Sequence, residues 1–368
     1  MIGMLAAHPA QAERRMNTID PSTPRLHCRP PDRVEDGVCV RTPEITRTRR
    51  SLAVAASVFP GVIVRGSGSY LVHEKRAAKR LLIMGGIGAG LIVAGGLPVG
   101  FTGGNEYFIE PFVPMIIAGS GLFVASWMSD IWVAAGGART LPEPRAATPW
   151  SVELGTTYLR DAYRERAFLR PAARYVLGRV EVGAVGWFDL LGEANEGMLE
   201  TRIRIIGPPP TGERVDDNSF LVVRAAGRAR SDDEDRVDVL TAEAELIGRL
   251  DMHRLDRALR GTFVELSTGI GVERASYPTD ESDAESLLLG RAVWGVYLRD
   301  RGEATMFYDH RRDHLAGGLA AWRAAGFVGS IGANADVRVG GPWAVRAEVE
   351  LGNAWVVTAA LRYQGGAR

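Results

Sequence analysis

The stretch PWAVRAEVELGNAWVVTAALRY, from Pro342 to Tyr363, decides the fold of this 368-residue chain. Apolar residues recur at every second position from Trp343 to Leu351, and the positions between them hold Ala344 and three charged residues, Arg346, Glu348 and Glu350. After the turn dipeptide Gly352-Asn353, a second alternating row runs from Trp355 to Tyr363. A period of two residues indicates β-strands with two different faces, and Gly-Asn favours a tight turn between them. The apolar face meets the core of a soluble sandwich, or the lipid around a membrane barrel.

Working outward, the same alternation extends back to Trp150, beyond the stiff Leu-Pro-Glu-Pro-Arg linker that begins at Leu141. Residues 148–368 contain about 12 such segments, or about 18 residues for each strand and turn, as a membrane barrel needs. The fold class that follows is an all-β, up-and-down membrane barrel of antiparallel strands. An α-helical apolar hairpin and a disordered N-terminus come before it.

The connections give a second indication of a barrel. Acidic clusters fall at 192–196, 232–235 and 280–283, which are all odd-numbered connections if Trp150 begins the first strand. Tight turns at Gly178, at 300–302 and at 340–342 fall on even-numbered connections, as do two longer segments, 207–218 and 251–261. In an up-and-down barrel the odd connections share one end, so we expect the acidic clusters outside and the tight turns in the periplasm.

Two apolar blocks precede the barrel, Leu81–Gly100 and Phe112–Ala135. Each is long enough for a membrane-spanning helix, and the short link between them predicts an antiparallel hairpin. Small residues recur at every fourth position, and we expect them to form the face on which the two helices pack. These residues are Gly86, Gly90 and Ala94 in the first block and Gly121, Ala125 and Ser129 in the second. The glycines do not fit the spacing of a nucleotide-binding loop.

The N-terminal segment suggests export. Residues 1–12 end in Ala10-Gln11-Ala12, the small-x-small pattern of a signal-peptidase site, so they are either a signal-peptide remnant or an ordinary disordered terminus. The two cysteines, Cys28 and Cys39, lie close enough in the sequence for a disulfide in an oxidising compartment. The expected divisions are residues 1–50 as an exported, mostly disordered segment, 51–140 as the hairpin, and 141–368 as the barrel.

Charged residues oppose the apolar rows, and in a barrel they point into the lumen. Lys+Arg and Asp+Glu are equal at 44 each, which excludes an electrostatic footprint for nucleic acid. Balanced signs favour an interior cross-linked by ion pairs over an ion-selective pore. The predicted structural lumen charges are Glu200, Arg202, Arg204, Arg224, Arg228, Glu243, Glu245, Arg346, Glu348 and Glu350.

One polar cluster could carry chemistry, and it contains Asp309, His310, Asp313 and His314. Adjacent residues on a strand point to opposite faces, so Asp309 and His310 are poorly placed as a catalytic pair. The sequence has no nucleophile setting of the Gly-x-Ser-x-Gly type. We therefore expect a protein that is not an enzyme, with no catalytic residues, no cofactor and no metal site. A barrel hydrolase is the less favoured hypothesis.

Residues 148–368 resemble Gram-negative outer-membrane β-barrels. The closing row Trp355, Val357, Ala359, Leu361 and Tyr363 is similar to the C-terminal strand that such barrels present to their assembly machinery, although here Gln364 to Arg368 follow the aromatic residue. FPGVIVRGSGSYLVHEKRAAKR and the blocks after it, residues 60–135, resemble bacterial two-helix membrane hairpins. The resemblance implies a non-enzymatic outer-membrane protein, structural or weakly pore-forming, whose partners are the lipid bilayer and that machinery.

An alternative remains open from the residues alone. Lys75 to Arg80 is a basic block before the first apolar helix, which by the positive-inside rule would be cytoplasmic. The protein would then be an inner-membrane-anchored soluble β-domain that serves as a binding or scaffold module. Neither hypothesis identifies a ligand or a transported solute.

Overall fold

The computed structural model describes residues 33–35, 38–40, 45–103, 106–137, 148–160, 165–192, 194–211, 217–232, 236–278, 282–299, 301–310, 329–352 and 354–366, with only the backbone for 33–35, 38–40 and 106–110. The chain divides into two compact units, Met1–Thr46 and Arg47–Arg368. In the first unit, β1 (Arg33–Glu35) and β2 (Val38–Val40) form a hairpin with Cys39 opposite Val34. Cys28 and the proposed signal-peptide residues 1–12 lie outside the described residues.

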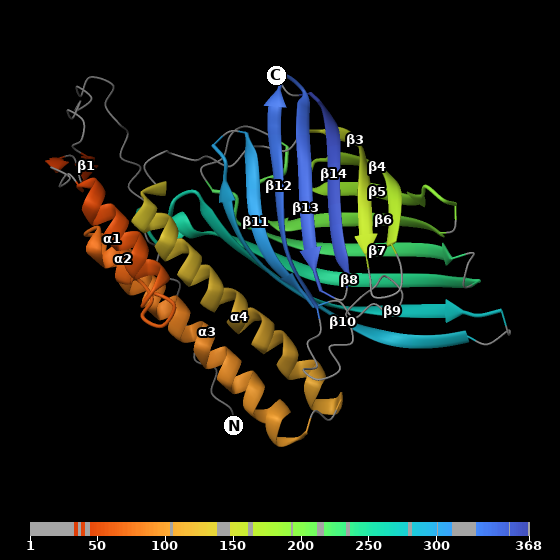
Figure 1. The fold of residues 1–368 in the computed structure, drawn as a ribbon, viewed down its shortest axis with the longest axis horizontal. Coiled ribbons are helices and arrows are strands. Elements are labelled where there is room, and N and C mark those ends of the chain that lie inside the picture. Colours follow the sequence, from red (N-terminus) through yellow and green to blue (C-terminus); the bar gives the residue numbers. More distant parts are fainter. Residues whose placement is uncertain are drawn as a thin grey trace, which may run out of the picture. The chain divides into compact units, whose positions relative to one another are not determined.

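The second unit contains a closed antiparallel barrel of twelve strands, β3 to β14, in which each strand pairs with its neighbours in sequence (Figure 1). The predicted fold class and strand number are thus confirmed. The strands are β3 (Trp150–Arg160), β4 (Glu165–Leu177), β5 (Val180–Asp189), β6 (Ala194–Ile206), β7 (Phe220–Asp232), β8 (Val237–Asp251), β9 (Thr262–Ser276), β10 (Ser282–Tyr297), β11 (Gly302–Asp309), β12 (Ser330–Gly340), β13 (Trp343–Leu351) and β14 (Trp355–Gly365).

The barrel closes between its first and last strands, β3 and β14. Their pairing is unbroken from Trp355 opposite Arg160 to Gly365 opposite Trp150. Because every strand is paired on both sides, no backbone edge is left for another chain or for lipid to satisfy. The prediction of closure between first and last strands is therefore confirmed.

The strand order also sorts the connections as expected. The three connections with acidic clusters join β5 to β6, β7 to β8 and β9 to β10, so they share the end of the barrel where β3 finishes. The tight turns and the segment 251–261 lie at the opposite end, with the two short 3-10 turns Met252–Arg254 and Arg257–Leu259 in that segment. We call these the outer end and the base.

Alternation along each strand gives the barrel an apolar outside and a polar inside. On β3, Val152 and Leu154 are 48% and 58% exposed on the exterior, whereas Glu153 is 7% exposed in the interior. Aromatic residues stand on the exterior near both ends. At the base, Tyr363 contacts both Trp150 and Trp343, with ring centroids 5.7 and 5.0 Å apart, and Trp355 is 63% exposed at the outer end. From Trp355 to Tyr363 the strand rises about 26 Å, or roughly 20 Å along the axis of a tilted barrel, close to the thickness of a membrane's apolar layer.

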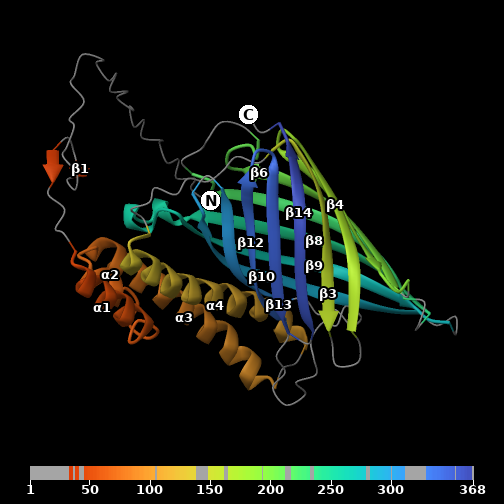
Figure 2. The same cartoon turned by 45° about the horizontal axis from the view of Figure 1, so that its top comes forward.

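Among the described residues, four α-helices precede the barrel: α1 (Arg47–Val58), α2 (Ser67–Leu71), α3 (Lys75–Phe101) and α4 (Glu106–Ala135). Helices α3 and α4 form the predicted antiparallel hairpin (Figures 1 and 2). Two segments, Lys75–Phe101 and Pro111–Ala135, are long and apolar enough to cross a membrane. Helix α3 extends beyond the predicted block at its N-terminal end and continues through Pro98.

The prediction of which glycines join the two helices was wrong. A Cβ on Gly88 would lie 2.7 Å from the carbonyl oxygen of Gly119, and one on Gly119 would lie 2.7 Å from that of Gly88. By contrast, a Cβ on Gly86 or Gly90 would meet nothing within 4 Å. The contact face of α3 is therefore offset by two residues from the predicted stripe, and the predicted stripe faces away from α4.

Two of the three small residues predicted on α4, Gly121 and Ser129, contact the barrel. A Cβ on Gly121 would lie 2.6 Å from that of Ala292 on the outside of β10. Ser129 accepts a hydrogen bond from the indole of Trp294 at 2.9 Å and donates to the sulfur of Met252 at 3.1 Å. Trp132 donates to the Arg260 carbonyl at 3.2 Å. Helix α4 thus runs along the outer wall of the barrel toward its base (Figure 2).

Asp130 of α4 joins this helix to α2 through buried hydrogen bonds. Its side chain is fully buried, and it accepts hydrogen bonds from the backbone amides of Gly68 and Ser69 at 3.1 and 2.7 Å and from the Ser69 hydroxyl at 2.6 Å. A carboxylate at the start of α2 stabilises that short helix, which explains a charge in an apolar block.

Candidate functional site: the charged lumen

A cavity of about 1140 Å³ occupies the interior of the barrel. Its lining extends from Arg179, in the turn between β4 and β5 at the base, to Gly352 and Ala354, in the connection between β13 and β14 at the outer end. Residues from all twelve strands line it, because the inward positions of the alternating strands converge on one axis. The cavity therefore follows the lumen from one end of the barrel to the other.

One ion-pair network lies where the barrel closes. Glu153 on β3 accepts hydrogen bonds from Arg362 on β14, at 2.8 Å from Nε and 2.6 Å from Nη2, and also pairs with Arg170 on β4. Arg362 pairs in turn with Asp336 on β12. Since these side chains are largely buried, each charge depends on its partners to offset the cost of its desolvation.

A second network is centred on Arg224 of β7. Its Nε lies 2.9 Å from Glu200, and its Nη1 lies 2.8 Å from both Glu243 and Glu245. Glu200 also pairs with Arg202 at 3.3 Å. One guanidinium thus joins β6, β7 and β8 through charge-assisted hydrogen bonds, which are stronger than neutral ones.

The remaining predicted lumen charges lie at several heights. Arg228 pairs with Glu196 at 3.3 Å. Arg204 donates to the Pro208 carbonyl at 2.8 Å, and its guanidinium lies 4.4 Å from the Phe220 ring centroid. Arg346 and Glu348 are 2.5 Å apart on β13, and Glu350 accepts from the Ser330 hydroxyl at 3.2 Å. Nine of the ten predicted residues line the cavity, and the tenth, Glu243, is buried against Arg224.

Among the described residues, three ion pairs join strands that are not neighbours: Arg362–Asp336 near the closure, described above, and two pairs that each span three strand steps and so cross part of the lumen. Near the outer end, Arg166 of β4 lies 3.0 Å from Asp232 of β7. Near the base, Arg249 of β8 lies 2.9 Å from Glu303 of β11, while its guanidinium also stacks 4.0 Å from the Phe263 ring. These two bridges narrow the passage at two levels.

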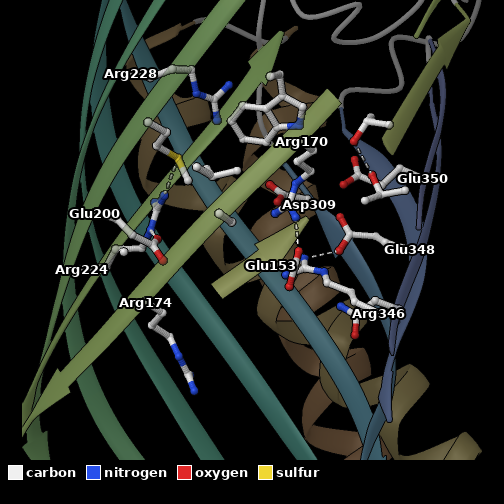
Figure 3. Close-up of a pocket in the computed structure, with 18 of the residues that line it drawn as sticks. Glu153, Arg170, Arg174, Glu200, Arg224, Arg228, Asp309, Arg346, Glu348 and Glu350 are labelled. Carbon is white, nitrogen blue, oxygen red and sulfur yellow. Dashed lines mark hydrogen bonds and ion pairs between the residues drawn. The ribbon is translucent and has the colours of Figure 1, made fainter. Parts of the chain in front are cut away.

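Positive and negative charges are segregated around the cavity wall. Among the described residues that line it, thirteen are arginine and twelve are carboxylates, yet the part of the wall from β4 to β7 holds nine of the arginines and four of the carboxylates. Figure 3 shows Arg174, Arg224 and Arg228 on one side of the cavity and Glu348 and Glu350 on the other. The nine arginines are Arg166, Arg170, Arg174, Arg179, Arg202, Arg204, Arg224, Arg228 and Arg230.

The polar cluster predicted at Asp309 and His310 does not form a catalytic pair. Asp309 lines the cavity 4.0 Å from Nε of Arg291, whereas His310 hydrogen-bonds through Nδ1 to the Tyr308 hydroxyl at 2.8 Å. Adjacent strand residues face opposite ways, as expected. Asp313 and His314 lie outside the described residues.

Another titratable group lies at the base, where Asp217, Asp251 and His253 bring their ligand atoms within 4.8 Å of one another. Asp251 accepts from the Tyr297 hydroxyl and from the backbone N–H of Asn218, both at 2.5 Å. Asp217 accepts from the Ser219 amide at 2.9 Å and from Arg254 Nε at 2.5 Å. Both carboxylates thus accept hydrogen bonds from donors within the protein. These bonds join the 207–218 connection to the 251–261 connection.

Sequence reasoning did not place the arginines of β4 in the lumen. Pro171 and the run Ala172-Ala173 obscure the alternation in this strand. The recoverable signal was the recurrence of arginine at even positions 166, 170 and 174. Asp336 and Glu303 were missed because no facing was assigned to their strands. All five residues line the cavity.

Comparisons with known proteins find similar solved structures but no matching sequence. No protein-family model and no curated protein sequence matches the chain. Among solved structures, the chain is similar to the KdgM porin, with 9% identity, a TM-score of 0.37 and coverage of 58% of this chain and 98% of that one. The outer membrane protein Omp33 of Acinetobacter baumannii gives 8% identity, a TM-score of 0.31 and coverage of 60% and 100%. The translocator domain of the autotransporter NalP from Neisseria meningitidis gives 12%, 0.34, 65% and 97%.

TM-scores this low do not define a shared fold in detail, so the class of this protein rests on its own geometry. The barrel is closed, its exterior is apolar between aromatic residues at both ends, and its charges face inward. A soluble sandwich would bury its large apolar side chains, whereas Leu154, Ile270 and Trp355 are 58%, 71% and 63% exposed on this exterior. These are the features of an outer-membrane β-barrel.

Proposed function

We propose that this protein is a non-enzymatic, weakly conducting pore of a Gram-negative outer membrane. The observation that carries the proposal is the cavity of about 1140 Å³ that reaches both ends of the closed barrel. The cross-lumen bridges Arg166–Asp232 and Arg249–Glu303 narrow the passage, which supports a small conductance. A purely structural barrel is the competing function.

The segregation of charge supports a pore that favours solutes with separated positive and negative groups. It does not support a pore that selects one ion. The near balance of arginines and carboxylates leaves little net charge to select anions or cations. The unequal distribution between the two walls produces a field across the lumen. A solute with separated positive and negative groups gains from aligning with that field, whereas a neutral sugar of the same size does not.

Reconstitution of the refolded protein in planar bilayers and in liposomes tests the proposal. We expect small single-channel steps with little preference between potassium and chloride, and faster liposome swelling with a zwitterionic amino acid than with a neutral polyol of similar size. The absence of any conductance from a barrel that is shown to be folded by its heat-modifiable mobility would contradict a pore and favour the structural role.

A variant of one bridge relates the conductance to the lumen. Arg166→Ser removes the outer cross-lumen pair with Asp232, so it should raise the single-channel conductance. Arg160→Ser is the matched control, since Arg160 forms an exposed pair with Glu165 on the neighbouring strand, with side chains 63% and 59% exposed. Equal conductance in both variants would place the conducting path elsewhere.

We also propose that recognition of β14 directs assembly of the protein in the outer membrane. This strand ends in the aromatic contact of Tyr363 with Trp150 and Trp343, and it completes the closure with β3. We propose that barrel assembly machinery binds this strand before closure. Tyr363→Ala should lower the yield of heat-modifiable barrel in cells while the purified variant still refolds in detergent.

A further inference from the structure

The helical segment before the barrel, residues 45–135, carries a charged surface that is explained neither by contact with the barrel nor by packing within the α3–α4 hairpin. Residues 45–80 contain eight lysines and arginines and a single acidic residue, Glu74. Four of the cations, Lys75, Arg76, Lys79 and Arg80, occupy the first two turns of α3, and all four are exposed. We call these four residues the basic collar. The concentration of one sign of charge on a short exposed segment favours an anionic partner.

The apolar surface begins immediately after the collar. On α3, Leu82, Ile83 and Ile87 are 52%, 51% and 54% exposed, and the exposed apolar residues continue to Phe101. Helix α4 lies against the barrel's lipid-facing wall, so α3 and the wall share one bilayer. The change from cations to apolar residues within one helical turn therefore locates the collar at the level of the lipid headgroups.

A second apolar feature flanks the collar. Phe59, Ile63 and Val64, in the loop between α1 and α2, are 74%, 73% and 53% exposed. The loop is held against the first turns of α3, because a Cβ on Gly66 would lie 2.5 Å from the carbonyl oxygen of Ala78. Exposed apolar residues beside a cluster of cations are the combination found on segments that lie in a membrane interface.

The end of the barrel at which the collar lies is fixed by contacts. Helix α4 finishes at the base, where Trp132 bonds to the Arg260 carbonyl, and α3 is antiparallel to it, so α3 begins at the base. The aromatic residues Trp150, Trp343 and Tyr363 mark the membrane interface at the same end. The collar, the apolar loop and the aromatic residues thus belong to one leaflet.

We propose that the basic collar and the loop containing Phe59, Ile63 and Val64 form a binding surface for anionic phospholipids of the leaflet at the base of the barrel. The cations contact headgroup phosphates, and the loop side chains enter the apolar edge of that leaflet. The surface would anchor the helical segment and set its depth, independently of whether the lumen conducts. Each cation near an anionic surface adds to the attraction, and salt weakens it.

Lipid analysis of the full-length protein tests this assignment. The refolded protein is incorporated into nanodiscs with phosphatidylglycerol and phosphatidylcholine in known proportion and then extracted with a mild detergent, and the retained phospholipids are quantified at 50 and 500 mM salt. We expect the ratio of the anionic to the zwitterionic lipid to be several times that of the nanodisc at low salt and to approach it at high salt. A ratio equal to the nanodisc composition at both salt concentrations would overturn the proposal.

Two charge-matched variants locate the binding surface. K75Q/R76Q/K79Q/R80Q removes the collar, and R160Q/R236Q/R274Q/R299Q removes four exposed cations elsewhere on the barrel. Both are first checked for the heat-modifiable mobility of a folded barrel. Loss of lipid enrichment in the collar variant alone supports the proposal, and equal loss in both would show that binding follows net charge and overturn it. Should the collar variant not fold, the salt comparison in the wild type still decides the outcome.

Discussion

Glu153 and Arg362 lie directly opposite each other where the first and last strands of the barrel meet, with the carboxylate 2.6 Å from Nη2 of the guanidinium. The pair therefore adds a charge-assisted contact to the backbone hydrogen bonds that close the barrel. Glu153 also pairs with Arg170 on β4, so a single carboxylate ties together three consecutive strands across the chain ends.

Removing that carboxylate should weaken the closure. Glu153→Ala leaves Arg170 without its ion-pair partner Glu153 and weakens the anchoring of Arg362, and we expect a loss of about 1–3 kcal/mol in the free energy of unfolding. Urea titration followed by tryptophan fluorescence measures it. Glu165→Ala is the control, because Glu165 and its partner Arg160 are mostly exposed and should contribute roughly 0–1 kcal/mol. Equal losses in the two variants would mean that the closing pair has no special weight.

The network around Arg224 should be more sensitive. Arg224→Met removes the cation shared by Glu200, Glu243 and Glu245, and we expect a destabilisation of about 3–5 kcal/mol because three carboxylates are then left close together in the barrel interior. Adding Glu200→Gln, Glu243→Gln and Glu245→Gln should recover most of that loss. A quadruple variant no more stable than Arg224→Met would exclude charge repulsion as the cause.

The hairpin offers a comparison between two glycines that differ by half a helical turn. Gly88→Leu places a side chain where the Cβ already lies 2.7 Å from the Gly119 carbonyl, so it should separate α3 from α4 and lower stability by about 1–3 kcal/mol. Gly86→Leu enters open space and should be tolerated. Thermal unfolding in detergent, followed by the helical circular dichroism signal, distinguishes the two. The opposite order of stability would restore the packing face predicted from the sequence.

Asp217 provides a pH-dependent contact outside the membrane. Partial burial acts to raise the pKa of Asp217, but hydrogen bonds from Ser219 and Arg254 outweigh it and hold the pKa below its ordinary value. Its contribution is therefore present above the ordinary pKa of an aspartate and is lost as the pH falls through the lowered one. Asp217→Asn should be less stable than wild type at pH 7, and the difference should disappear in strong acid. A difference that persists unchanged at pH 2 would exclude this carboxylate as the cause.

Most of the barrel could be predicted because one physical rule acts on every strand. A side chain that faces lipid must be apolar and its neighbour need not be, so the facing of β13 and β14 is visible in the sequence. The rule fails where the alternating pattern is interrupted, as by Pro171 in β4. The strand number followed from counting the alternating segments, whereas the position of Glu153 opposite Arg362 was not predicted and comes from the register between β3 and β14.

Helix packing could not be predicted in the same way. Helix α3 has glycines on several faces, and its sequence does not say which of them meets a partner. Gly88 lies in the helix contact because Gly119 of α4 is opposite it. Gly121 lies against the barrel because it meets Ala292, on a strand more than a hundred residues away in the sequence. The position of a second element decides such contacts, and local pattern does not record it.

The contact between α4 and β10 has a consequence for biogenesis. Gly290 and Ala292 are small residues on the exterior of β10, and Ile117 and Gly121 of α4 cover them. A barrel that entered the bilayer alone would offer lipid a strip of wall with little apolar area, and a hairpin alone would lack that wall. Each part therefore needs the other to cover this surface, and the helices and the strands must be delivered to the same bilayer. If the hairpin were inserted into another membrane first, the barrel would lack the helix that covers β10.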